Sequence, residues 1–106
     1  MSISLEKKVF DFSIRVAELV KYLREDDKNF PLCERMLSCG VGAGLALRGG
    51  GTKEAAKLVS ETDYIIEMAI IAGYMKKQQG VHIREDCESI LKEVKDQQVK
   101  TGETVV

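Results

Sequence analysis

The sequence predicts an all-α protein, an antiparallel up-down-up-down four-helix bundle that forms a single domain over residues 1–106. Apolar residues recur every three or four positions in four segments, and no segment alternates apolar and polar residues as a strand would. The connections between the segments are short, which favours antiparallel neighbours. The chain is long enough for one core and too short for two. Its 44% apolar and 31% charged residues exclude a disordered chain.

The first helix is predicted over residues 4–26. Its apolar residues are spaced 4, 3, 4, 3, 4, as in a heptad repeat, so they form one continuous stripe. The acidic run 25–27 and the pair Phe30-Pro31 end this helix, because the residue before a proline avoids the helical region. The stripe consists of Leu5, Val9, Phe12, Val16, Leu19 and Leu23, and Phe10 and Val20 are expected to widen it.

The second helix is predicted over residues 31–48, with Pro31 in its first turn. Gly40, Gly42 and Gly44 each cost this helix about 1 kcal/mol relative to Ala. We expect close packing against a neighbouring helix to offset that cost. A dinucleotide-binding loop is the less favoured interpretation, because such a loop follows a strand and here a helical segment precedes it.

The third helix is predicted over residues 52–79, with Thr52 as its N-cap. One seam with spacings 3, 4, 3, 4, 3 is expected to face the other helices: Ala55, Leu58, Thr62, Ile65, Ala69 and Ala72. From residue 64 to residue 75 the helix is apolar almost all round, which indicates burial on every side. The additional stripe, predicted to be an oligomer interface, consists of Tyr64, Met68, Ile71 and Met75.

The fourth helix is predicted over residues 82–99, after a break at residues 76–80. Its apolar residues are spaced 4, 3, 4, which predicts a single buried stripe: Ile83, Cys87, Ile90 and Val94. We expect the tail, residues 100–106, to be flexible.

Residues that support catalysis in helical bundles are scarce. His82 is the single histidine, so the paired Glu-x-x-His motifs of di-iron bundles are absent. Asp63 and Glu67 lie one turn apart, and an ion pair with Lys or Arg is the more common use of such carboxylates than acid catalysis. We therefore expect no catalytic residue, no cofactor and no metal ion. A small helical enzyme that uses a buried carboxylate stays an alternative.

The cysteines and the hydropathy indicate a cytoplasmic protein. Cys33, Cys39 and Cys87 are odd in number and lack the CxxC spacing, and no secretory segment precedes them, so we expect three buried thiols in a reducing compartment. The longest nearly uncharged run, residues 64–75, is far shorter than the roughly 20 residues that span a bilayer. We expect no membrane partner.

The charge balance does not indicate a polyanionic partner. The chain has 16 basic and 17 acidic side chains, and the acidic ones are interleaved with the basic ones at both expected ends of the bundle. Nucleic-acid binding is therefore weakly supported. If it occurs, the candidate contacts are Arg48, Lys53 and Lys57.

Six short stretches of the chain resemble a bacterial family of four-helix-bundle proteins first noticed in intervening sequences of large-subunit ribosomal RNA genes. The matching stretches are Phe12-Ser13-Ile14-Arg15-Val16, Leu19-Val20-Lys21-Tyr22-Leu23, Phe30-Pro31-Leu32, Arg35-Met36-Leu37, Gly44-Leu45-Ala46-Leu47-Arg48 and Glu61-Thr62-Asp63-Tyr64-Ile65-Ile66-Glu67-Met68. The resemblance covers roughly residues 9–75. It implies a ring-like homopentamer of uncertain function, and some distant relatives are nucleic-acid-binding accessory proteins of reverse transcriptases.

These observations favour a non-enzymatic, homo-oligomeric scaffold or binding protein that recruits a protein partner the sequence does not identify. A nucleic-acid-binding accessory protein is the first alternative, and retention on RNA or heparin that falls steeply with salt distinguishes it. The small helical enzyme is the second alternative, and it requires a pocket beside Glu67.

Overall fold

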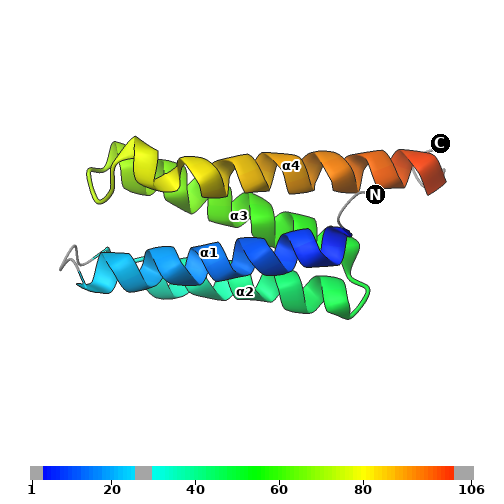
Figure 1. Cartoon of the computed structure of the whole chain (residues 1–106), viewed down its shortest axis with the longest axis horizontal. Helices are drawn as coiled ribbons and strands as arrows, with labels where there is room; N and C mark the ends of the chain where they lie inside the picture. Colours follow the sequence, from blue (N-terminus) through cyan, green and yellow to red (C-terminus); the bar gives the residue numbers. More distant parts are fainter. Residues whose placement is uncertain (1–3, 26–29, 102–106) are drawn as a thin grey trace.

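The computed structural model of the chain describes residues 4–25 and 30–101. These residues form four helices, α1 (Leu5–Glu25), α2 (Cys33–Arg48), α3 (Thr52–Ile71) and α4 (Lys77–Thr101). Each helix packs against the next one in the chain, and α1 also packs against α4, which closes the bundle (Figure 1). The predicted antiparallel four-helix bundle is confirmed.

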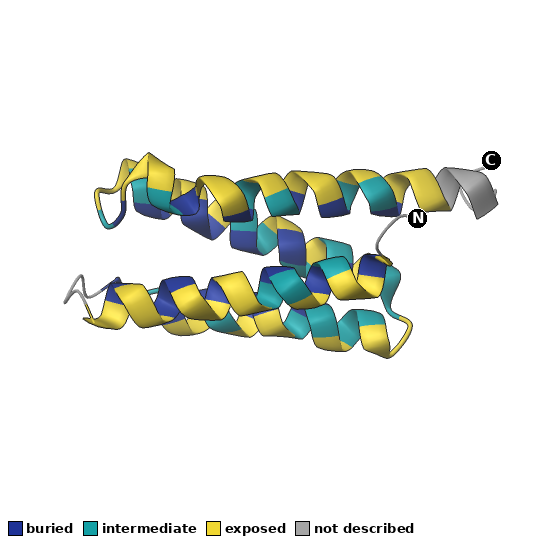
Figure 2. Cartoon of the chain, in the orientation of Figure 1, coloured by how far each residue is buried: buried dark blue, intermediate teal, exposed yellow. Residues whose placement is uncertain are grey.

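The heptad stripe of α1 lies in the core as predicted. All six of its residues are buried, and so is Val20; dark blue marks this inner side in Figure 2. The expectation for Phe10 is wrong, because this side chain is 49% exposed. Phe10 follows Val9 by one position, which turns it about 100° away from the stripe. The helix begins after Ser4, whose Oγ accepts a hydrogen bond from the backbone N–H of Lys7 at 3.2 Å.

The second helix begins at Cys33, two residues later than predicted. The backbone N–H of Cys33 donates to the carbonyl of Phe30 at 3.3 Å, so Pro31 and Leu32 belong to the turn that precedes the helix. At the other end, Gly50 has a φ of +86°, which lets the chain reverse within three glycines. The cap of α3 is Gly51 rather than Thr52, and no side chain caps this terminus.

The third helix ends at Ile71, so its predicted extension to residue 79 is wrong. Gly73 has a φ of +88°, and the backbone N–H of Tyr74 donates to the carbonyl of Ala69 at 2.9 Å. A left-handed glycine just after the last turn, with a hydrogen bond back across it, is a common helix stop. The predicted seam is also partly wrong, since Ala72 is exposed and Leu58 is half-buried. A straight helix drifts away from a strict heptad, and the buried face of α3 consists of Ala55, Val59, Thr62, Ile65, Ile66 and Ala69.

The fourth helix begins at Lys77, five residues earlier than predicted. The side-chain Oε1 of Gln79 accepts a hydrogen bond from the backbone N–H of Lys76 at 2.7 Å, as one half of a capping box does. Gly80 is buried inside α4, where a Cβ would lie 2.8 Å from Cγ2 of Ile66. The helix continues through Thr101, which corrects the start of the predicted tail, and residues 102–106 of that tail lie outside the described residues. The predicted stripe of α4 is buried throughout.

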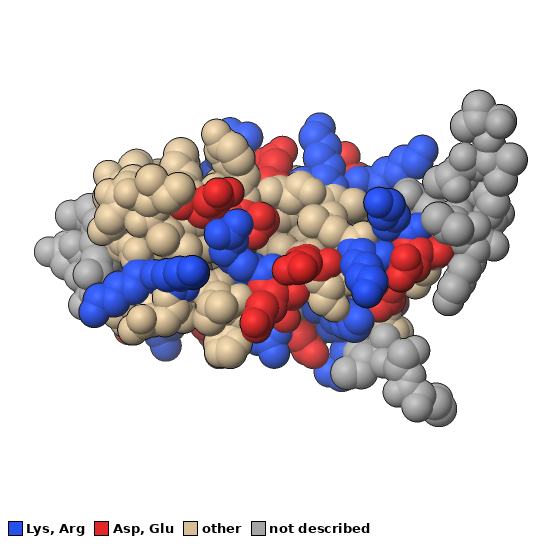
Figure 3. Space-filling view, turned by 90° about the horizontal axis from the view of Figure 1, so that it is seen from above, with Lys and Arg blue, Asp and Glu red and all other residues tan. Residues whose placement is uncertain are grey.

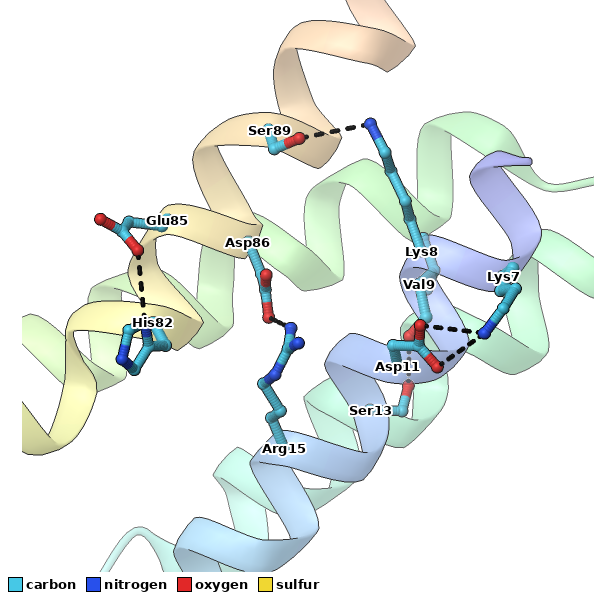
Figure 4. Close-up of polar contacts among 10 residues, drawn as sticks. All are labelled: Lys7, Lys8, Val9, Asp11, Ser13, Arg15, His82, Glu85, Asp86 and Ser89. Atoms are coloured by element: carbon cyan, nitrogen blue, oxygen red, sulfur yellow. Dashed lines mark hydrogen bonds and ion pairs between the residues drawn. The ribbon is translucent and has the colours of Figure 1, made fainter. Parts of the chain in front are cut away.

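Polar side chains join α1 to α4 along one side of the bundle. The Nζ of Lys8 lies 2.7 Å from Oε1 of Glu93 and 3.4 Å from Oγ of Ser89. Farther along, Arg15 pairs with Asp86 (Figure 4). Gln79 donates to the hydroxyl of Tyr22 at 2.8 Å. The α1–α4 seam is therefore closed at its surface by ion pairs and hydrogen bonds above the apolar core.

Candidate functional site

Three exposed apolar side chains follow one face of α3 near its C-terminal end. Tyr64 is 68% exposed, Met68 36% and Ile71 80%. Their spacing of four and three residues places them on one side of the helix, and we call them the α3 ridge. Shallow depressions of about 230 and 330 Å³ flank the ridge, the first toward Leu32 and Arg35 of the α2 side and the second toward Glu67. A contiguous exposed apolar strip is typical of an interaction site.

Met75 does not belong to this surface, so its prediction as an interface residue is wrong. It is only 5% exposed. Because α3 ends before Gly73, the chain turns and carries Met75 back into the core, where its Cε lies 3.0 Å from the position of a Cβ on Gly80. Beside it, the ring of Tyr74 packs on Phe30 with 4.9 Å between ring centroids. The helical spacing that placed Met75 with Ile71 does not apply across the turn.

A second apolar surface, which the sequence reasoning missed, lies between α1 and α2. It is a groove of about 250 Å³, and we call it the α1/α2 groove. Its exposed apolar side chains are Leu45 (64%), Phe10 (49%), Ile14 (42%) and Val41 (39%). The groove is lined by Glu6, Phe10, Ser13, Ile14, Ala17, Val41, Gly44, Leu45 and Arg48. The sequence does contain a signal for this groove. Each helix has a pair of apolar residues four positions apart outside its buried stripe, Phe10 with Ile14 and Val41 with Leu45.

The predicted close-packing glycines all meet a neighbouring helix. A Cβ at Gly40 would lie 2.8 Å from Cγ1 of Val16, and a Cβ at Gly44 would lie 3.2 Å from Oγ of Ser13, both on α1. Gly42 instead faces α3, where a Cβ would lie 3.2 Å from Cδ1 of Leu58. The hydroxyl of Ser13 donates to the carbonyl of Gly40 at 2.6 Å. Gly40 and Gly44 therefore allow the close approach of α1 and α2, and Gly44 also forms part of the groove.

The three candidate nucleic-acid contacts lie on two different surfaces. Arg48 is at the end of the α1/α2 groove, where its Nε lies 3.5 Å from Oε1 of Glu6 and its guanidinium lies 5.6 Å from the centre of the Phe10 ring. Lys53 and Lys57 are exposed on α3. Over the face that α4 presents, basic and acidic side chains are interleaved (Figure 3). A binding face for phosphates needs clustered positive charge, and this face does not provide it.

The carboxylates of α3 form ion pairs with an arginine of α4. The Nε of Arg84 lies 2.9 Å from Oδ1 of Asp63, and its Nη2 lies 3.6 Å from Oε1 of Glu67. The hydrogen bond that Arg84 donates to Asp63 raises the pKa of Arg84 above its ordinary value. An open depression of about 410 Å³ adjoins Asp63 and Arg84 and is lined largely by charged residues of α4. This geometry is that of a surface ion-pair network between two helices.

The thiols are held in their neutral form. Burial raises the pKa of Cys87 to about 12 and that of Cys39 to about 11. The Sγ of Cys39 donates to Oε2 of Glu61 at 3.2 Å, and this hydrogen bond lowers the pKa of Glu61. All three cysteines are buried as predicted. A neutral buried thiol is a poor nucleophile and a poor metal ligand.

Residues 4–25 and 30–101 contain neither a cluster of metal ligands nor a membrane-spanning helix. Within these ranges, no three His, Cys, Asp or Glu side chains lie together as a metal site would require. His82 is on the surface, with Nδ1 3.4 Å from Oε1 of Glu85 (Figure 4). In the same ranges, each helix is too short or too polar to cross a bilayer.

One solved structure is similar in fold to this chain. It is a protein with unknown function from the S23 ribosomal protein family of Bacteroides thetaiotaomicron VPI-5482, and it superimposes with a TM-score of 0.80. The two chains are 24% identical, and the match covers 86% of this chain and 94% of that chain. No family model matches the sequence, and no curated protein matches it. At this level of identity the similarity establishes the shared all-helical fold.

Proposed function

We propose that this chain is a non-enzymatic, homo-oligomeric scaffold whose subunits meet through the α3 ridge. The observation that carries the proposal is the exposure of Ile71 and Tyr64, at 80% and 68%, on a helix whose opposite face is fully buried. Large apolar side chains that stand together in water favour association, and Met68 between them gives an adaptable contact.

The similarity to the Bacteroides structure supports membership in the same bacterial family, since the two chains match over most of both lengths. The sequence resemblance over residues 9–75 points the same way and adds the expectation of a ring-like homopentamer. We propose five subunits on that basis. The mass of the assembly in solution tests this number directly.

The other two functions have less support. Glu67 lines a depression of about 330 Å³, but its side chain is 52% exposed rather than buried, and both Asp63 and Glu67 lie within ion-pair distance of Arg84. Arg48 lines the α1/α2 groove and is paired with Glu6, whereas Lys53 and Lys57 are exposed on α3. Binding to RNA or heparin that weakens steeply with salt would support the nucleic-acid alternative instead.

Light scattering coupled to size-exclusion chromatography tests the scaffold proposal. The unmodified protein should run as an oligomer at tens of micromolar, and the double variant Met68→Glu, Ile71→Lys should run as a monomer with unchanged helicity. The matched control is Glu88→Lys, Lys92→Glu, which exchanges one acidic and one basic residue on the exposed side of α4 and should leave the oligomer intact. An unmodified protein that runs as a monomer would overturn the proposal.

A further inference from the structure

The bundle has two apolar surfaces of unlike shape on different sides. The α3 ridge projects, with Ile71 as its most exposed residue, whereas the α1/α2 groove is hollow and encloses about 250 Å³. In the described part of the chain α3 packs against α2 and α4, and α1 packs against α2 and α4. The helices α1 and α3 are therefore diagonal in the bundle. A surface on α3 and a surface that α1 shares with α2 consequently face different directions.

We infer that the α3 ridge of one copy docks into the α1/α2 groove of a second copy. This inference rests on the proposed oligomer and specifies how its subunits meet. A helix that enters an apolar groove presents residues at positions i, i+4 and i+7, and Tyr64, Met68 and Ile71 have this spacing over about 10 Å of helix. The walls of the groove are likewise apolar, with one exposed pair on each helix, Phe10 with Ile14 and Val41 with Leu45.

One exposed side chain at each surface has a charge opposite to that of the other: Arg48 at the groove and Glu67 beside the ridge, each already paired within its own chain. Arg48 closes one end of the groove with a guanidinium that is 61% exposed, and its partner Glu6 is at the long distance of 3.5 Å. Glu67 stands beside the ridge with a carboxylate that is 52% exposed, 3.6 Å from Arg84. Exposed pairs of this kind contribute little within one chain, so both groups can accept an additional partner from a second copy.

A contact between unlike surfaces has a consequence for assembly. Each copy has one ridge and one groove, so every copy can bind one neighbour on each side. Such a heterologous contact repeats around a closed ring or along an open chain. A contact between two ridges would instead stop at a dimer and leave the groove of both copies exposed to water.

Mixing two defective variants tests the inference. The ridge variant is Met68→Glu, Ile71→Lys, and the groove variant is Val41→Glu, Leu45→Lys; both change residues that are exposed in the single chain. Each variant alone should be a monomer in light scattering, and circular dichroism should show that each keeps its helices. An equimolar mixture should form a species of twice the monomer mass, because the intact groove of one variant accepts the intact ridge of the other.

The outcomes separate this inference from the proposed function. If the unmodified protein is a monomer, both fail. If it is an oligomer and the folded groove variant assembles as well as the unmodified protein, the scaffold stands and the docking inference is wrong. If both folded variants are monomers and their mixture also stays monomeric, the docking inference is again wrong.

Cross-linking provides a second measurement that does not depend on a disruptive variant. The native cysteines are all buried, so a short bis-maleimide reacts with cysteines introduced at the surface. In the oligomer, an equimolar mixture of Leu45→Cys and Ile71→Cys should give linked pairs that contain one copy of each variant. Either variant alone should give none. Efficient linkage within Ile71→Cys alone would show that ridges meet ridges and would overturn the inference.

Discussion

Val16 of α1 packs directly on the backbone of Gly40 in α2, where a methyl group on the glycine would lie 2.8 Å from Cγ1 of the valine. One turn away, the hydroxyl of Ser13 donates to the carbonyl of the same glycine at 2.6 Å. Both contacts require α1 and α2 to approach closely. The cost of Gly40 inside a helix is therefore offset by packing and by a hydrogen bond between the helices.

Replacing Gly40 should destabilise the bundle. Gly40→Ala gains about 1 kcal/mol of helix propensity. It also forces a β-branched neighbour to move, and overpacking of a well-packed core costs about 1–3 kcal/mol. We expect a net loss of stability in urea unfolding. The matched control is Gly42→Ala, which meets only the flexible end of Leu58 and should be neutral or stabilising. A Gly40→Ala protein as stable as that control would contradict the close-packing argument.

We expect Gly73 to be the residue that ends α3. Its φ of +88° is strained for a residue with a Cβ, so Gly73→Ala should cost about 1–2 kcal/mol. Gly73→Asn should cost less, because Asn tolerates the left-handed region. No atom outside the adjacent backbone lies within 4 Å of a Cβ at this position, so the effect would be conformational rather than steric. Thermal unfolding of the three proteins measures it, and equal midpoints for all three would exclude a helix-stop role.

The Cys87 thiol should make the fold sensitive to alkaline pH. Burial raises its pKa from 9.0 to about 12, so the folded chain keeps the proton at a pH where the unfolded chain loses it. This contribution to stability is complete below pH 9 and is lost as the pH rises toward 12. At about pH 10.5 the loss should reach about 2 kcal/mol. Urea unfolding of the unmodified protein and of Cys87→Ala at neutral and alkaline pH tests this prediction. The free energy of unfolding should decrease less with rising pH in the variant than in the unmodified protein. Equal decreases in the two proteins would contradict the prediction.

The sequence predicts most of the fold because the core of each helix follows a simple period. The stripes of α1 and α4 are buried as expected, and Gly50 turns the chain where three glycines stand together. The errors cluster at the α3–α4 connection. The helical spacing of apolar residues continues through Gly73, so the sequence pattern predicts a longer helix. The left-handed conformation of Gly73 that ends α3 goes with local backbone hydrogen bonds, which the pattern does not reveal. Gly73 directly follows the C-cap residue Ala72. A glycine at this position is a common signal for the end of a helix.

The candidate surfaces were only half predictable for a different reason. Tyr64, Met68 and Ile71 lie on one helix, so their spacing alone places them together. The α1/α2 groove is made by two helices, and its width depends on the contact between Val16 and Gly40. Helical periodicity gives the direction of a side chain on its own helix. It does not give the distance between helices, which determines whether two exposed faces form a groove.

Met75 and Ile71 should respond in opposite ways to the same substitution. Met75 is 5% exposed and Ile71 is 80% exposed, although a continuous helix would place them on one face. Met75→Ala should cost about 2–5 kcal/mol of folding stability, as deletion of a buried side chain does, and should leave a folded protein able to assemble. Ile71→Ala should change the folding stability of the monomer by less than about 0.5 kcal/mol and should weaken the oligomer. Urea unfolding at high dilution and light scattering at high concentration separate the two effects. The reverse pattern, a stable but monomeric Met75→Ala, would mean that the third helix runs through Gly73 and that Met75 belongs to the interface after all.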